Sequence, residues 1–135
     1  MPLEIRQHER EGVIILAMKG RIVAGDESAA LRETIAGLIA GGHKNLALNL
    51  GGVEYIDSTG LGALVMCATT TRRSGGNVKL VNLSKRSIEL LVMTRLATAF
   101  EIFADEQEAV NSFFPDRKIK TFDILDFVQK AKDEN

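Results

Sequence analysis

The chain has 135 residues, of which 45% are hydrophobic, and 17 basic against 18 acidic residues give a formal net charge of −1. This length suits one domain with a short appendage. Because the basic residues do not outnumber the acidic ones, direct binding to nucleic acid is not expected. The start of the chain lacks a signal segment and no stretch approaches the ~20 apolar residues of a membrane span, so we expect a cytoplasmic protein without a membrane segment.

The elements of the first half follow from its hydrophobic pattern. We predict strands at 3–7, 13–18 and 46–50, and a helix from about Asp26 to the glycines at 41–42. The polar run 8–12, which contains His8, is the predicted turn between the first two strands. The second strand is apolar without alternation, which is typical of a strand covered on both faces. Gly20 to Gly25 are expected to form an irregular link, and Gly51-Gly52 a break after the third strand.

The second half alternates helix and strand. We predict helices at about 58–74, 85–95 and 106–114, with strands at 78–81 and 101–103 between them. Leu83 with Ile88 indicates a hydrophobic staple around the expected N-cap Ser84, and Asp105 with Glu108 indicates a capping box. Because helices connect the later strands, their pairing should be largely parallel. The expected fold class is therefore α/β, a mixed sheet of four to five strands covered by about four helices.

Residues 115–135 follow the predicted domain of residues 1–114. After a linker at 116–120, an apolar helical face is formed by Ile124, Phe127, Val128 and Ala131. Such a short helix is marginal in water unless that face is buried. We expect it to dock on the domain's own surface, and a homodimer or recognition of another protein is the alternative.

The turn from the third strand into the next helix carries the candidate site. Asp57 or Ser58 is the expected N-cap, and a capping turn with no further role is the simplest interpretation. The alternative is phosphorylation of Ser58, because the free amides of a helix N-terminus face an added charge of about −1.5 to −2. Modification would then change what the surface binds more than whether the domain folds.

An apolar strand followed by Val53-Glu54-Tyr55-Ile56-Asp57-Ser58-Thr59-Gly60-Leu61-Gly62 resembles the signature of the STAS family, specifically its bacterial anti-sigma factor antagonists. The resemblance covers about residues 3–114. It implies a small cytoplasmic binding module in which the serine at position 58 is phosphorylated by an anti-sigma factor that is also an ATP-dependent serine kinase. The unphosphorylated form would bind that kinase and free the sigma factor, and a phosphoserine phosphatase would reverse the modification.

The partner-binding surface is expected to comprise Asp57, Ser58, Thr59, Gly60, Gly62, Arg21 and Val23. Gly60 would keep the helix start open to close approach, and Gly62 would either leave a patch without a side chain for the partner or serve tight internal packing. Relatives usually carry acidic residues just after the glycine at position 20, where Arg21 and Val23 stand here. The resemblance places Ser58 before Thr59 as the phosphate acceptor.

A rival function within the family is a non-switching STAS scaffold or sensory module that binds other proteins or a small ligand. The complete Asp57-Ser58-Thr59-Gly60 motif favours the switch, and the added C-terminal helix favours the rival slightly. A neighbouring kinase or phosphatase gene would discriminate between the two.

Catalysis is not expected. There is no G-x-S-x-G elbow, and both histidines, His8 and His43, are predicted in loops. Gly20 to Gly25 has the glycine spacing of a phosphate loop, but Asp26-Glu27 stand where a lysine and a hydroxyl are required. The single cysteine, Cys67, is predicted to be buried, and two separated histidines offer no metal-ligand spacing, so no cofactor or metal is predicted.

Overall fold

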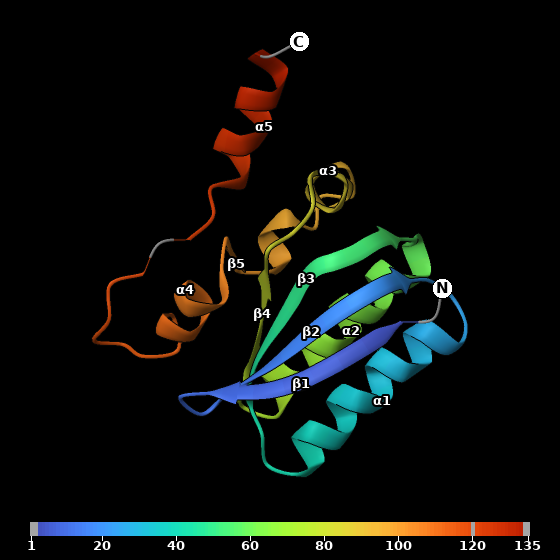
Figure 1. Cartoon of the computed structure of the whole chain (residues 1–135), viewed down its shortest axis with the longest axis vertical. Coiled ribbons are helices and arrows are strands. Elements are labelled where there is room, and N and C mark those ends of the chain that lie inside the picture. Colours follow the sequence, from blue (N-terminus) through green and yellow to red (C-terminus); the bar gives the residue numbers. More distant parts are fainter. Residues whose placement is uncertain (1–2, 120, 134–135) are drawn as a thin grey trace.

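The structure is a computed structural model that describes residues 3–119 and 121–133, with the backbone alone for 131–133. In chain order its elements are β1 (Glu4–Arg10), β2 (Val13–Ile22), α1 (Asp26–Ala40), β3 (Asn45–Ile56), α2 (Ser58–Arg73), β4 (Asn77–Val81), α3 (Lys85–Met93), the 3-10 helix η1 (Ala97–Ala99), β5 (Ile102–Phe103), α4 (Glu106–Asn111) and α5 (Ile124–Asp133). Figure 1 shows one sheet with helices packed against it and α5 projecting from the body. None of the described helices is long and apolar enough to cross a membrane.

The sheet has five strands in the order β1-β2-β3-β4-β5. β1 pairs with β2 antiparallel, and the remaining neighbours are parallel. The predicted α/β class and mixed sheet are therefore confirmed. Because β2 and β3 run in parallel and Ile22 pairs with Ile56, the segments that follow these two strands leave the sheet at the same edge.

Two apolar clusters cover the two faces of the sheet, and alternate residues of β2 contribute to each. Leu16 and Met18 belong to the larger cluster with residues of α1, α2 and α3, whereas Val13 and Ile15 belong to the smaller one with residues of α4. All four side chains are buried. The start of β2 is thus covered on both faces, as its unbroken apolar run predicted.

The predicted break at Gly51-Gly52 is wrong, because β3 continues through both glycines to Ile56. A Cβ added to Gly52 would lie 2.8 Å from the carbonyl oxygen of Met18, and one on Gly51 would overlap the side chain of Asn82. These glycines therefore admit close neighbours within the sheet and do not interrupt the strand.

Other element boundaries also differ from the prediction. β1 extends to Arg10, so His8 lies in a strand, and the turn is Glu11-Gly12, where φ is positive at both residues. β2 continues through Gly20 to Ile22, where the irregular link was expected to begin. Its register against β3 shifts before and after Gly20. α4 ends at Asn111 and α3 at Met93, earlier than predicted, while the N-caps Ser84 and Asp105 are confirmed by hydrogen bonds from Ser87 N and Glu108 N.

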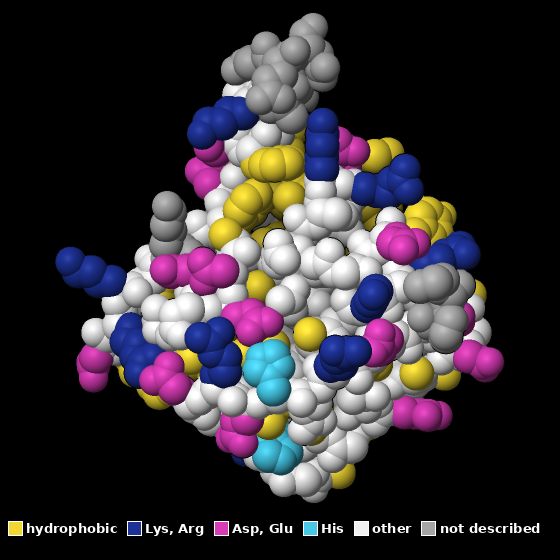
Figure 2. Space-filling view, in the orientation of Figure 1, with side chains coloured by type: hydrophobic (Ala, Val, Ile, Leu, Met, Phe, Trp, Pro, Cys, Tyr) yellow, Lys and Arg dark blue, Asp and Glu magenta, His cyan; other side chains and the backbone are white. Residues whose placement is uncertain are grey.

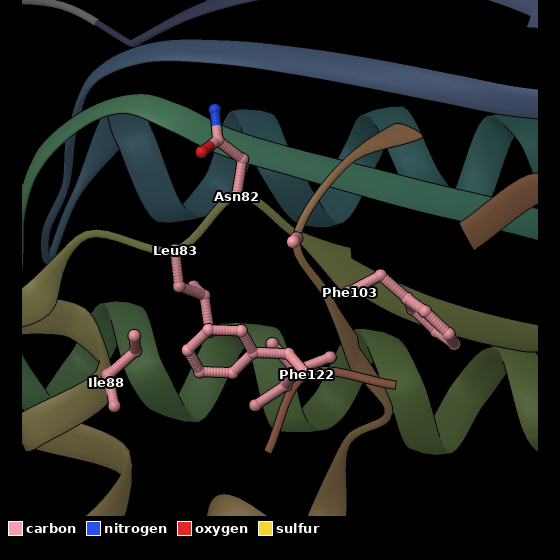
Figure 3. Close-up of a pocket in the computed structure, with 7 residues that line it drawn as sticks. Asn82, Leu83, Ile88, Phe103 and Phe122 are labelled. Atoms are coloured by element: carbon pink, nitrogen blue, oxygen red, sulfur yellow. The ribbon is translucent and has the colours of Figure 1, made fainter. Parts of the chain in front are cut away.

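The C-terminal segment returns to the body through Phe122. Its backbone N–H donates to the Ile102 carbonyl oxygen of β5 at 2.8 Å, and its ring packs against the larger apolar cluster. Figure 3 shows the ring directed toward Leu83 and Ile88, the predicted staple pair. Of the predicted apolar face of α5, Ile124 packs against the larger cluster, and Phe127 and Val128 are half-buried. The side chain of Ala131 lies outside the described residues.

Candidate functional site

Asp57 caps the helix at the strand-to-helix turn. It has an extended conformation between β3 and α2, and its Oδ1 atom accepts a hydrogen bond from the Gly60 N–H at 2.7 Å. Its carbonyl oxygen accepts the first helical bond, from Leu61 N at 2.9 Å. Asp57, and not Ser58, is therefore the N-cap, which leaves the hydroxyl of Ser58 without a capping role.

The second carboxylate oxygen of Asp57 reaches the neighbouring link between β2 and α1. Oδ2 accepts a hydrogen bond from the Ala24 N–H at 3.0 Å, while the Asp57 N–H donates to the Ile22 carbonyl oxygen at 3.2 Å. The hydrogen bonds from Gly60 and then Ala24 lower the pKa of Asp57, and Arg21 adds to the effect. The carboxylate is therefore ionised at neutral pH and joins two segments 33 residues apart in sequence.

The link after β2 is fixed by its own hydrogen bonds. The Val23 carbonyl oxygen accepts from both the backbone N–H of Ser28, at 3.1 Å, and its hydroxyl, at 2.6 Å. Gly25 has φ of 98° at the turn into α1, a conformation that favours glycine. Val23 is half-buried in this frame, whereas Arg21 is exposed.

Ser58 and Thr59 both lie exposed in the first turn of α2. Neither hydroxyl has a hydrogen-bond partner within the described part of the chain. Gly60 behind them is buried, and a Cβ there would overlap the Ile22 carbonyl oxygen. Gly60 therefore allows the backbone of Ile22, within the same protein, to approach α2 closely.

Gly62 differs from Gly60 because it is exposed and a Cβ there would meet nothing within 4 Å. Tight internal packing is thus wrong as the reason for this glycine. Ser58, Gly62, Met66 and Thr70 follow each other at a spacing of four residues and are all exposed, so they form one stripe along α2. Met66 is 57% exposed in a helix whose other face is buried, and it was not among the predicted partner-binding residues.

Arg21 and Tyr55 form a second feature beside the turn. They are register partners on β2 and β3, and the Arg21 guanidinium carbon lies 5.5 Å from the centroid of the Tyr55 ring. Tyr55 is 40% exposed. Tyr55 was not among the predicted site residues, although an aromatic residue two positions before the expected cap is the signal that could have found it.

The two histidines lie far from Ser58. His43 precedes β3 and Ser58 follows it, and this strand of 12 residues spans roughly 35 Å. His8 is opposite Ile15 on β2, near the start of β3, and its Nε2 atom contacts Glu106 Oε1 at 3.2 Å. Neither imidazole can act as a base for Ser58.

Cys67 is buried within α2, as predicted, and burial raises the pKa of its thiol to about 11. A thiol that stays protonated at neutral pH is not a nucleophile. Gly20 belongs to β2 and Gly25 to the turn before α1, so these two glycines do not form the continuous cradle of a phosphate loop.

Comparison with known proteins points to one family. The STAS domain profile matches residues 4–109. The anti-sigma-B factor antagonist of Bacillus subtilis strain 168 is 32% identical over 108 residues, which cover 80% of this chain and 95% of that protein.

Solved structures share the fold. An anti-sigma factor antagonist from Mycobacterium paratuberculosis has a TM-score of 0.70 at 21% identity, covering 82% of this chain and 92% of that one. SpoIIAA in its unphosphorylated form has a TM-score of 0.64 at 16% identity, covering 83% and 99%. The same Bacillus protein in its phosphorylated form also scores 0.64, at 17% identity, covering 82% and 99%.

Proposed function

The chain belongs to the STAS domain family, and we propose that within this family it is an anti-sigma factor antagonist whose binding is switched at Ser58. The identity to the Bacillus subtilis antagonist and the fold shared with both forms of SpoIIAA support this assignment. In this proposal residues 1–114 form the STAS unit and residues 115–135 are an addition to it. One observation carries the switch: the exposed Ser58 hydroxyl has no partner within the described structure, although it lies in the first turn of α2.

The frame around Ser58 does not depend on its hydroxyl. Asp57 provides the cap and binds Ala24, and Gly60 packs against Ile22. A phosphoryl group on Ser58 would therefore break no hydrogen bond of the described structure, and its charge of about −1.5 to −2 would be placed at the favourable end of the helix. Phosphorylation should leave the fold intact and change the surface.

The effect on a bound partner follows from charge. The unmodified surface presents two neutral hydroxyls beside the ionised Asp57, whose charge is already bound to two backbone amides. A partner shaped to that surface would meet a second, unpaired anion after phosphorylation, and losing ~3 kcal/mol lowers affinity more than a hundredfold. Phosphorylation would thus release the partner.

The partner in this proposal is an anti-sigma factor that is also an ATP-dependent serine kinase. It would cover the stripe of Ser58, Gly62, Met66 and Thr70 on α2, together with Arg21 and Tyr55 beside it. Gly62 lets a partner backbone approach, and Met66 offers an apolar contact one turn further on. The unphosphorylated chain would hold the kinase and free the sigma factor, and a phosphoserine phosphatase would restore this form.

The proposed role is binding and not catalysis. The relatives that share the sequence and fold are named as antagonists, and neither histidine reaches Ser58. Ser58 is accordingly the substrate of the partner's kinase activity. No cofactor or metal enters the proposal.

The experiment is affinity capture from the host lysate with three baits, the wild-type chain, Ser58→Glu and Gln7→Glu, with bound proteins identified by mass spectrometry. Gln7 is exposed on β1 and pairs with Leu16 of β2, well before the end of β2 at Ile22, so Gln7→Glu adds the same charge away from the site. We expect an ATP-binding anti-sigma kinase with wild type and Gln7→Glu and its loss with Ser58→Glu. If all three baits hold the same non-kinase proteins, the chain is a scaffold or sensory module.

A further inference from the structure

The C-terminal segment joins the outer edge of the sheet at β5, the last strand in the sheet order. The carbonyl oxygens of Glu101 and Phe103 accept hydrogen bonds from β4 and the residue after it, whereas that of Ile102, between them, faces the outer edge. There it accepts a hydrogen bond from the backbone N–H of Phe122 at 2.8 Å. A peptide that adds to a free sheet edge makes the same kind of bond, so the segment occupies a place that a separate peptide could take.

A pocket beside this edge holds the Phe122 ring. Leu83 and Ile88 line the pocket on the side of α3, and Phe103 lines it on the side of β5. Figure 3 shows the ring directed toward Leu83 and Ile88. The ring is half-buried and also contacts Phe127 of α5, with ring centroids 5.6 Å apart. An open cavity of about 110 Å³ remains beside it, so the pocket accepts an aromatic side chain without being filled by it.

The segment is attached to the body at few points. Within the described residues 121–128, the N–H of Phe122 is the only backbone group that bonds to the body, and Ile124 adds a contact with the larger apolar cluster. The Asp123 side chain bonds within the segment, where it accepts from the Asp126 N–H at 2.9 Å. Figure 2 shows hydrophobic side chains gathered at the base of α5, where the segment returns to the body. A segment with so few buried contacts opens locally at a lower free-energy cost than the sheet itself.

We propose that the outer edge of β5 and the pocket beside it form a peptide-binding groove, and that residues 121–128 are its built-in ligand, held as a strap that opens. Phe122 supplies both features that the groove recognises, a backbone N–H for Ile102 and an aromatic ring for the pocket. When the strap opens, the groove takes the same segment of a second copy, because that segment carries the same two groups. The groove is built from β5 and α3, whereas Ser58 follows β3 at the start of α2, so the two sites use different elements.

Binding of a labelled peptide of residues 116–133 to the full chain, measured by fluorescence anisotropy, tests this proposal. The groove of the wild-type chain is filled by its own strap, so wild type should bind the peptide at least about tenfold more weakly than Phe122→Ser, whose strap has lost its ring. A peptide that itself carries Phe122→Ser should bind neither chain. Leu125→Ser in the full chain is the matched control, because it changes a 75% exposed side chain of α5 and should bind the peptide no better than wild type.

Amide hydrogen exchange of the wild-type chain, followed by NMR, tests the opening without any substitution. The Phe122 amide should exchange at least about a hundredfold faster than the Leu80 amide, which bonds to Glu101 on the inner side of β5 at 2.9 Å. Equal protection of the two amides would overturn the proposal, and so would equal peptide binding by wild type and Phe122→Ser or its absence from both. A Phe122→Ser chain that is unfolded by circular dichroism would also overturn it, since the strap would then belong to the core of the domain.

Discussion

The carboxylate of Asp57 accepts a hydrogen bond from the backbone N–H of Ala24 across 3.0 Å. The same side chain caps α2 through Gly60, so a single residue holds the start of this helix against the link between β2 and α1. Ser58, the next residue, is held in place by bonds in which its own hydroxyl takes no part. The hydrogen bonds that hold the turn therefore leave the Ser58 hydroxyl without a role in the fold.

The pH dependence of stability should reveal the role of Asp57. Its pKa is lowered below the ordinary 3.8, so its contribution is complete above that value and is lost as pH falls through the lower native pKa. Urea unfolding of Asp57→Asn should therefore show a lower midpoint than wild type at pH 7, with the difference shrinking below about pH 4. Asp116→Asn, in the exposed segment after Phe114, is the control. A constant difference at all pH values would contradict this role.

Two glycines of α2 should respond in opposite ways to alanine. Gly60→Ala places a Cβ on the Ile22 carbonyl oxygen and should cost about 1–3 kcal/mol in the free energy of unfolding. Gly62→Ala meets open space and should gain up to about 1 kcal/mol from helix propensity. Chemical denaturation measures both values, and equal effects would show that the backbone approach at Gly60 is not what selects glycine.

Much of this arrangement was predictable because its signals are local. The caps at Ser84 and Asp105 follow from a side chain and an amide three residues apart, and the same pattern narrowed the cap of α2 to Asp57 or Ser58. The bond from Ala24 to Asp57 was not predictable, because a backbone amide has no sequence signature and the two segments meet only in the folded sheet.

Glycine was the ambiguous signal. Gly51-Gly52 predicted a break, but both residues lie within β3. A Cβ on Gly52 would meet the backbone of Met18, whereas one on Gly51 would meet the end of the Asn82 side chain. The same ambiguity left Gly62 undecided between packing and exposure until its surroundings were known. The sequence identifies a glycine, but whether that glycine allows close packing or lies exposed depends on its distance to atoms that are remote in sequence.

Binding should be sensitive to bulk at Gly62. Gly62→Arg should weaken binding of the captured kinase more than tenfold, because it fills the patch between Ser58 and Met66. Gly37→Arg is the matched control, since Gly37 is also an exposed helical glycine with open space around it, but on α1. Surface plasmon resonance compares the two, and equal affinities would remove the α2 stripe from the interface.

Cys67 should be inert in the folded protein. Because burial holds its thiol pKa at about 11, reaction with a thiol reagent at pH 8 should be slow and should accelerate many-fold in urea. Reaction in the native state at the rate of a free thiol would contradict the packing of α2 against the sheet.

The central claim is tested most directly by titration calorimetry of the captured kinase with the unmodified chain and with the chain phosphorylated at Ser58. The account predicts a dissociation constant at least about a hundredfold higher for the phosphorylated form, equivalent to ~3 kcal/mol, with unchanged circular dichroism. Equal dissociation constants for the two forms would contradict it.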